Sequence, residues 1–186
     1  MITLILTSAG WQRECEKNQN LMNSESAKKL ECLEKKQQAA LAAENIAFFI
    51  EQCNDGLLLL DNAVEKAENI TENTVKKYIT KMSNSHTNIN GYLSQLSGLQ
   101  SRLLNIESMY QKMVQNHQDN YDEYFNRKAN AGSYATTAQY NNRTDSVTGE
   151  FIPGVCTGVY YGTIKDEMEG VTWVEWKIDF YQLEVL

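Results

Sequence analysis

The chain has 186 residues, of which 42% are hydrophobic and 22% are charged, and its formal net charge at neutral pH is −7. This length fits one domain, or one domain with an appendage, and the hydrophobic content permits a packed core. Because an acidic chain is repelled by phosphate backbones, the charge argues against non-specific binding to nucleic acid.

The first ten residues, MITLILTSAG, contain a short apolar run from Ile2 to Leu6, followed by small residues. The favoured interpretation is a β-strand that joins a C-terminal sheet, and the alternative is the remnant of a secretory signal without its basic start. The run is too short to span a bilayer, and no other apolar stretch approaches the length of roughly 18 residues that a membrane helix needs. We therefore expect no transmembrane helix.

Residues 11–53 are rich in Glu, Lys, Gln, Ala and Leu, and the first 152 residues contain no proline. Strong helix formers without a helix breaker predict long helices. The alanine-rich run 39–43 favours close approach of another helix, and Asn54-Asp55-Gly56 is typical of a turn or a helix end. The apolar contacts expected in this part come from Leu30, Leu33, Leu41, Phe48 and Ile50.

Residues 71–124 carry the clearest pattern, a spacing that alternates between four and three residues without a break. A repeat of this kind predicts a coiled-coil seam, which a second helix must cover. The polar segment 83–91 leaves two alternatives, a turn that folds the chain into an antiparallel hairpin or one continuous helix. The seam positions are Thr71, Val75, Tyr78, Met82, Ser85, Ile89, Tyr92, Leu96, Leu99, Leu103, Ile106, Tyr110, Met113, His117, Asn120 and Tyr124.

The composition changes near residue 130, and we expect residues 129–186 to be β-rich. Residues 130–150 are small, polar and turn-forming, which indicates a loop or weak strands. Residues 155–165 and 171–186 predict two strands joined by a turn at 166–170, with residues 1–6 as a candidate third strand. Trp173 and Trp176 lie on opposite faces of the second predicted strand, and aromatic side chains there are candidate contacts for a partner.

Few residues suggest chemistry. The cysteines at positions 15, 32, 53 and 156 match no zinc spacing, so free thiols are expected, with one or two disulfides as the alternative. His117 lies on the predicted seam, where a polar group more often fixes register than catalyses, and His86 is expected at the surface. The chain contains no catalytic or nucleotide-binding motif. We therefore expect no enzyme activity, no cofactor, no metal and no small-molecule substrate.

The expected fold is mainly α with a small β appendage: a long antiparallel helical hairpin or coiled-coil bundle, followed by a C-terminal β-hairpin or small sheet. The expected regions are 1–10, a strand or signal remnant; 11–128, the helical part; and 129–186, the β-rich part. The candidate interaction residues are Leu96, Leu99, Leu103, Ile106, Tyr110, Met113, Tyr160, Tyr161, Trp173 and Trp176.

These features predict a structural or assembly protein that forms homo-oligomers, with virion, secretion-system and surface-appendage components as the classes considered. Two alternatives are a small acidic adaptor or inhibitor that binds a basic protein, and an exported adhesin or pilus-associated subunit. The location stays open between cytoplasm and virion, with export if residues 1–10 are a signal remnant.

Overall fold

The computed structural model describes residues 2–67 and 72–161. Its contacts divide the chain into two compact units: a terminal unit of residues 1–28 and 116–186, and a middle unit of residues 29–115. Two helices run through both units. Strand β1 (Ile2–Thr7) leads into α1 (Ser8–Ala67), and α2 (Asn73–Tyr140) leads into β2 (Arg143–Thr144), β3 (Phe151–Ile152) and β4 (Val155–Tyr160).

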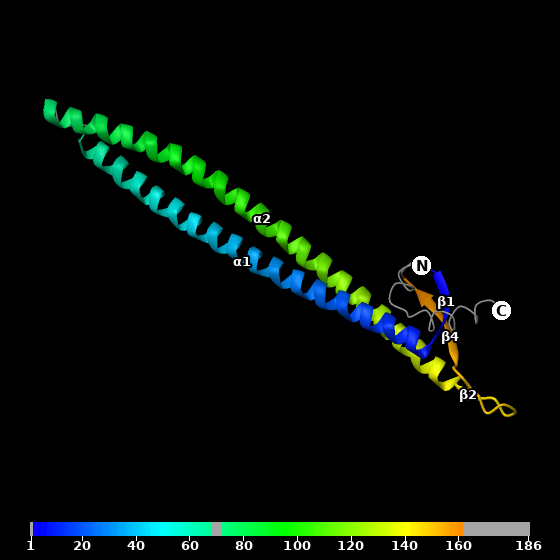
Figure 1. The fold of residues 1–186 in the computed structure, drawn as a ribbon. Helices are drawn as coiled ribbons and strands as arrows, with labels where there is room; N and C mark the ends of the chain where they lie inside the picture. The colour runs from blue at the N-terminus through cyan, green and yellow to red at the C-terminus, as the bar shows by residue number, and fades with distance from the viewer. Residues whose placement is uncertain (1, 68–71, 162–186) are drawn as a thin grey trace. The chain divides into compact units, whose positions relative to one another are not determined.

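The predicted class is confirmed: two long helices pack together as a hairpin, and a small antiparallel sheet accompanies them (Figure 1). Helix α1 has 60 residues and α2 has 68. Such lengths are possible because the first proline in the sequence is Pro153, beyond the end of α2.

The turn or helix end predicted at Asn54-Asp55-Gly56 is wrong, because these residues lie inside α1. Of the two alternatives for the polar segment 83–91, the continuous helix is the one observed, because the segment lies inside α2. In the second case, hydroxyl side chains return hydrogen bonds to the carbonyl four residues earlier, as from Thr87 Oγ1 to Ser83 at 3.1 Å. Polar side chains that satisfy themselves on their own helix do not end it. Helix α1 continues to Ala67, and α2 begins at Asn73.

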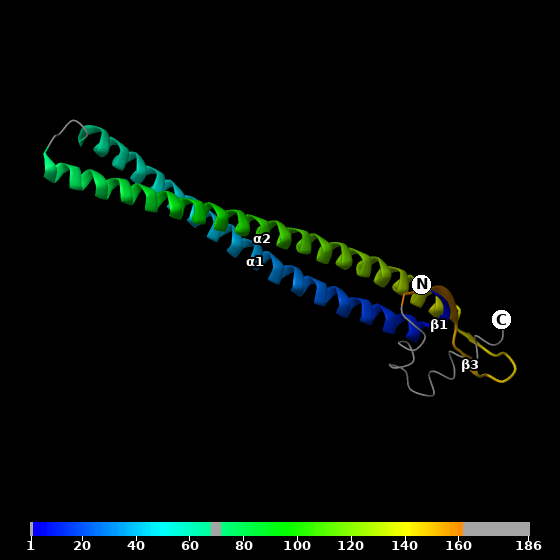
Figure 2. The same cartoon turned by 90° about the horizontal axis from the view of Figure 1, so that it is seen from above.

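In the middle unit the helices run side by side in opposite directions, as both views show (Figures 1 and 2). The less exposed positions of each helix alternate four and three residues apart, which is the repeat of a coiled coil. We call these the inner positions. They are 29, 32, 36, 39, 43, 46, 50, 53, 57, 60, 64 and 67 on α1, and 75, 79, 82, 86, 89, 93, 96, 100, 103, 107, 110 and 114 on α2.

In the middle unit the predicted seam has the right period, but only six of its twelve positions there are inner. The first predicted seam position, Thr71, lies outside the described residues. The seam positions at 75, 82, 89, 96, 103 and 110 are inner, whereas those at 78, 85, 92, 99, 106 and 113 lie one residue before an inner position and are exposed. The reason is chemical: the true inner row contains His86, Gln100 and Glu107, while the neighbouring outer row is mostly apolar.

The contacts predicted for α1 also need correction. Leu30, Leu33, Leu41 and Phe48 are exposed, while Ile50 is an inner position. Small residues take the buried places, among them Cys32, Ala39 and Ala43. The expectation that the alanine run allows close helix approach fits this burial, since Ala39 and Ala43 carry no side chain beyond Cβ.

In the terminal unit, β1 and β4 form an antiparallel pair whose register runs from Ile2 opposite Tyr160 to Thr7 opposite Val155. The prediction that the first residues join a C-terminal sheet is thus confirmed. The segment expected to be a loop after residue 130 is helical as far as Tyr140. Its small residues cover the sheet, and the core consists of Leu4, Leu6, Trp11, Ala131, Ala135, Ala138 and Tyr160.

Strands β2 and β3 form a second, short antiparallel pair. The Asp145 carboxylate accepts hydrogen bonds from the amides of Val147 and Thr148 at 2.7 and 2.9 Å, and Gly149 has a φ of 72°. These bonds close a compact turn between the two strands.

The predicted turn at 166–170 and the predicted strand at 171–186 lie outside the described residues. Within the described part of the chain, no helix has an apolar stretch long enough to cross a bilayer.

Candidate interaction surface

The ten candidate interaction residues fall into three groups. Leu96, Leu103 and Tyr110 occupy inner positions between the helices. Leu99, Ile106 and Met113 point away from the inner row and are 47%, 40% and 38% exposed. Of the aromatic residues in the tail, Tyr160 is fully buried and Tyr161 is exposed, while Trp173 and Trp176 lie outside the described residues.

The exposed residues of α2 form a regular row. Tyr78, Tyr92, Leu99, Ile106 and Met113 are all exposed, and they recur at intervals of seven residues, or of fourteen where Ser85 interrupts. We call these five residues the outer row. A spacing of seven places them on one line along the helix, next to the inner positions. The middle unit therefore carries a line of large, mostly apolar side chains that its own two helices cover only in part.

Helix α1 also exposes large apolar side chains in the middle unit. Single exposed apolar residues are ordinary on protein surfaces, but a concentration on a two-helix unit is typical of a surface that contacts another protein. The residues concerned are Leu30, Leu33, Leu41, Phe48, Phe49, Leu58 and Leu59.

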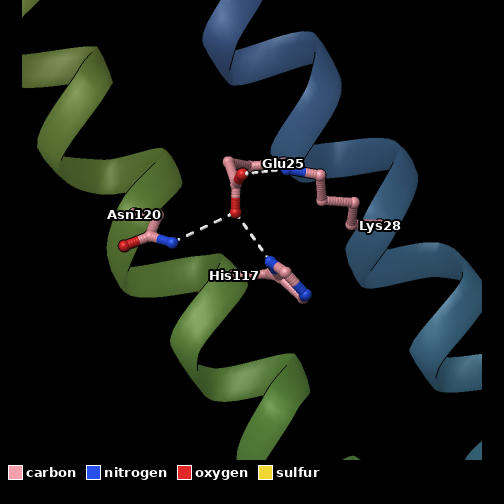
Figure 3. A network of polar contacts seen from close by, with 4 residues as sticks. All are labelled: Glu25, Lys28, His117 and Asn120. Carbon is pink, nitrogen blue, oxygen red and sulfur yellow. Dashed lines mark hydrogen bonds and ion pairs between the residues drawn. The ribbon is translucent and has the colours of Figure 1, made fainter.

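The terminal unit contains a cluster of polar side chains around the buried Glu25, shown in Figure 3. The Glu25 carboxylate projects from α1, with Oε2 2.6 Å from His117 Nδ1 and accepting a hydrogen bond from Asn120 Nδ2 at 3.2 Å, both on α2. Its Oε1 atom accepts a hydrogen bond from Lys28 Nζ at 2.8 Å. The bonds from Lys28 and His117 lower the pKa of Glu25 to about 2.

A carboxylate that is buried but fully paired can fix how two helices align. The expectation that His117 has a structural role fits this contact. The sequence analysis missed Glu25, because one glutamate among many in a charged helix gives no signal until its partner helix is placed.

Several aromatic residues of the terminal unit are part of its hydrophobic core or pack against it. The indole Nε1 of Trp11 donates a hydrogen bond to the Cys156 carbonyl at 3.0 Å, and the ring packs 4.8 Å from that of Tyr134. Lys17 Nζ donates to the Tyr160 hydroxyl at 3.2 Å. Tyr160 is thus held inside the unit, where a partner cannot reach its ring. Tyr161 lies near the surface with its ring 4.3 Å from the Arg127 guanidinium.

A second exposed apolar group surrounds the short β2–β3 pair. Val147 is 91% exposed, and Tyr140 and Phe151 are also exposed. The turn-forming composition of this segment pointed to a loop but gave no indication that its apolar residues would be presented to solvent.

The described residues offer little for catalysis. They contain no group of three or more His, Cys, Asp or Glu side chains arranged to hold a metal ion. His86 Nε2 lies 3.1 Å from Asp61 Oδ1 beside a shallow hollow, and both side chains are substantially exposed. The four cysteines are free thiols, of which Cys32 is buried. Burial raises the pKa of Cys15, so its thiol is a weak nucleophile.

Comparison of the chain with protein-family models, with curated proteins and with solved structures gave no match.

Proposed function

We propose that this protein is a non-catalytic structural or assembly protein that self-associates through the helical hairpin of its middle unit. The observation that carries the proposal is the outer row, in which five large apolar side chains lie exposed along one line of α2. Exposed apolar surface costs about 25 cal/mol per Å², so covering the row with another helix is favourable.

The setting we propose is a virion, a secretion system or a surface appendage. The feature that supports it is the pair of long helices without an internal proline. Components of such assemblies act by occupying a place in a larger array, and an extended helical surface suits that role better than a pocket does.

The test is the mass of the full chain in solution, measured by light scattering after gel filtration at micromolar concentration. We expect a mass at least twice the 21.2 kDa of one chain. A monomer at every concentration would contradict self-association. A monomer that binds a basic protein with an affinity that falls as salt rises would favour an acidic adaptor instead, because salt screens charge attraction.

A further inference from the structure

We infer that the occupant of the outer row is a second copy of this chain, docked on one defined face of the middle unit; the inference rests on the proposed function. The face follows from the coiled-coil repeat. Each residue of the outer row comes directly before an inner position of α2. On α1, the residues directly before inner positions 36, 43, 50, 57 and 64 are Lys35, Ala42, Phe49, Gly56 and Ala63.

In an antiparallel helix pair, equivalent positions of the repeat lie on the same side of the pair. The structure shows this on the opposite side, where Asp61 and Ser83, each directly after an inner position, line the same hollow. The outer row of α2 and the row of Lys35, Ala42, Phe49, Gly56 and Ala63 on α1 therefore share one face.

This face has a raised half on α2, formed by the outer row, which we call the ridge. Its α1 half is lower, because most of its side chains are small, and we call that half the furrow. The α2 half carries large side chains, whereas three of the five residues on the α1 half are Ala or Gly. A Cβ added at Gly56 would meet nothing within 4 Å, so the space beside it is open. Two copies related by a twofold axis can place each ridge in the other's furrow, and this self-complementarity is what a symmetric dimer requires.

The charges on this face also favour a second copy over a different partner. The next positions outward on α1 are Gln38, Asn45, Gln52 and Leu59, with Glu31 before them and Lys66 after them at the two ends of the row. Those on α2 are Lys81, Asn88, Gln95, Arg102 and Met109. Between residues 38 and 63, the carboxylates of α1 (Glu44, Glu51, Asp55 and Asp61) all occupy other positions of the repeat.

We use the name carboxylate-free face for the outward positions from Gln38 to Leu59 on α1 and from Lys81 to Met109 on α2, together with the outer row, Ser85 and the residues Ala42, Phe49, Gly56 and Ala63 of α1. Like charges brought together cost several kcal/mol, so two copies of a chain with a net charge of −7 meet most easily where neither presents a carboxylate. A basic partner, in contrast, would be drawn to the other faces.

The face is large enough to form a specific dimer interface. From Tyr78 to Met113 it runs roughly 50 Å along α2 at 1.5 Å per residue, and a width of about 12 Å gives roughly 600 Å² on each copy. The total of about 1,200 Å² lies at the lower end of the range for specific stable interfaces.

The experiment compares two double variants of the full chain by light scattering and sedimentation. Leu99→Glu with Ile106→Glu places two carboxylates on the face. Ser94→Glu with Ser108→Glu makes the same charge change at exposed positions of α2 outside it. We expect the wild type and the serine variant to be dimers, and the first variant to be a monomer at about tenfold the concentration at which the wild type is dimeric.

Gly56→Lys provides a variant that cannot be mistaken for loss of folding. It fills the furrow at a site with open space and replaces a glycine inside a helix, so the monomer should be as helical as the wild type by circular dichroism. We expect it to lose the dimer. We also expect the wild-type dissociation constant to change less than about threefold between roughly 0.05 and 0.5 M NaCl, because the face contains few charges.

The outcomes separate the two proposals. If the wild type is an oligomer and the Leu99/Ile106 and Gly56 variants keep its mass, the carboxylate-free face is not the interface, while self-association stands. If the wild type is a monomer, both proposals fail.

Discussion

Nδ1 of His117 lies 2.6 Å from Oε2 of Glu25, and this contact joins α1 to α2 through a carboxylate that is 7% exposed. A buried charge is tolerated only when its partners replace the water that it has lost. Here Lys28, His117 and Asn120 supply three such contacts.

Replacing Glu25 with Gln should lower the free energy of unfolding by about 1–3 kcal/mol at neutral pH, because the three partners lose a charged acceptor. The measurement is urea denaturation followed by circular dichroism. Glu31→Gln is the matched control: Glu31 also pairs with a lysine of its own helix but is exposed, so we expect little change.

The same carboxylate predicts a dependence on pH. Its pKa is about 2 in the folded protein, below its ordinary value of 4.5. Its contribution to stability is therefore complete above pH 4.5 and is lost as the pH falls towards 2. The melting temperature of the wild type should fall more steeply over this interval than that of Glu25→Gln. Parallel curves for the two proteins would show that Glu25 is not held as a carboxylate.

Gly158→Ala should destabilise the terminal unit by about 1–3 kcal/mol, because the added Cβ would crowd a packed site. It would lie 2.5 Å from Tyr134 Cδ2 and 2.7 Å from Trp11 Cζ2. Gly91→Ala is the control, since a Cβ there meets nothing and alanine favours the helix by roughly 0.5–1 kcal/mol. Thermal melts of the two variants should shift in opposite directions.

The register of the middle unit can be tested with two neighbouring leucines. Leu103 is an inner residue and Leu104 is 49% exposed. Leu103→Ala should cost about 1–2 kcal/mol, less than a fully buried leucine does, whereas Leu104→Ala should stay within about 0.5 kcal/mol. Equal losses in chemical denaturation would contradict the observed register.

Thiol titration should find four reactive cysteines in the unfolded chain without reductant, since all four are free. In the folded protein Cys32 should react most slowly, because it is only 6% exposed. Mass spectrometry after brief alkylation would rank the four sites. A titre of two or none would indicate disulfides and would contradict the structure.

Composition was enough to predict the helices and the strand at the start of the chain, because both depend on local preferences and on periodicity. The register was not predictable by counting apolar residues. Inner positions such as Gln100 and Glu107 are polar, while outer ones such as Leu99 and Ile106 are apolar. An apolar stripe shows that a surface will be covered, but not whether the chain's own second helix or another molecule covers it.

The end of α1 at Ala67 and the start of α2 at Asn73 were also not predictable from the sequence. No glycine or proline lies between Ala67 and Asn73, whereas the Asn-Gly pair at 90–91 lies inside a helix. Local turn preferences were overruled by the continuous 4-3 repeat on both sides of that pair. The role of Glu25 depended on the same alignment, because two of its three partners, His117 and Asn120, are more than 90 residues away along the chain.

The pairing of β1 with β4 has a consequence for biosynthesis. Thr7 is made 148 residues before its partner Val155. At roughly 5–20 residues per second, a ribosome adds that length in about 7–30 s. During this interval Leu4, Leu6 and Trp11 await the strand and helix end that bury them, while the hairpin is free to form from residues already emerged. We therefore expect the small sheet to close last, so that nascent chains halted before Val155 expose this apolar strand to chaperones and proteases.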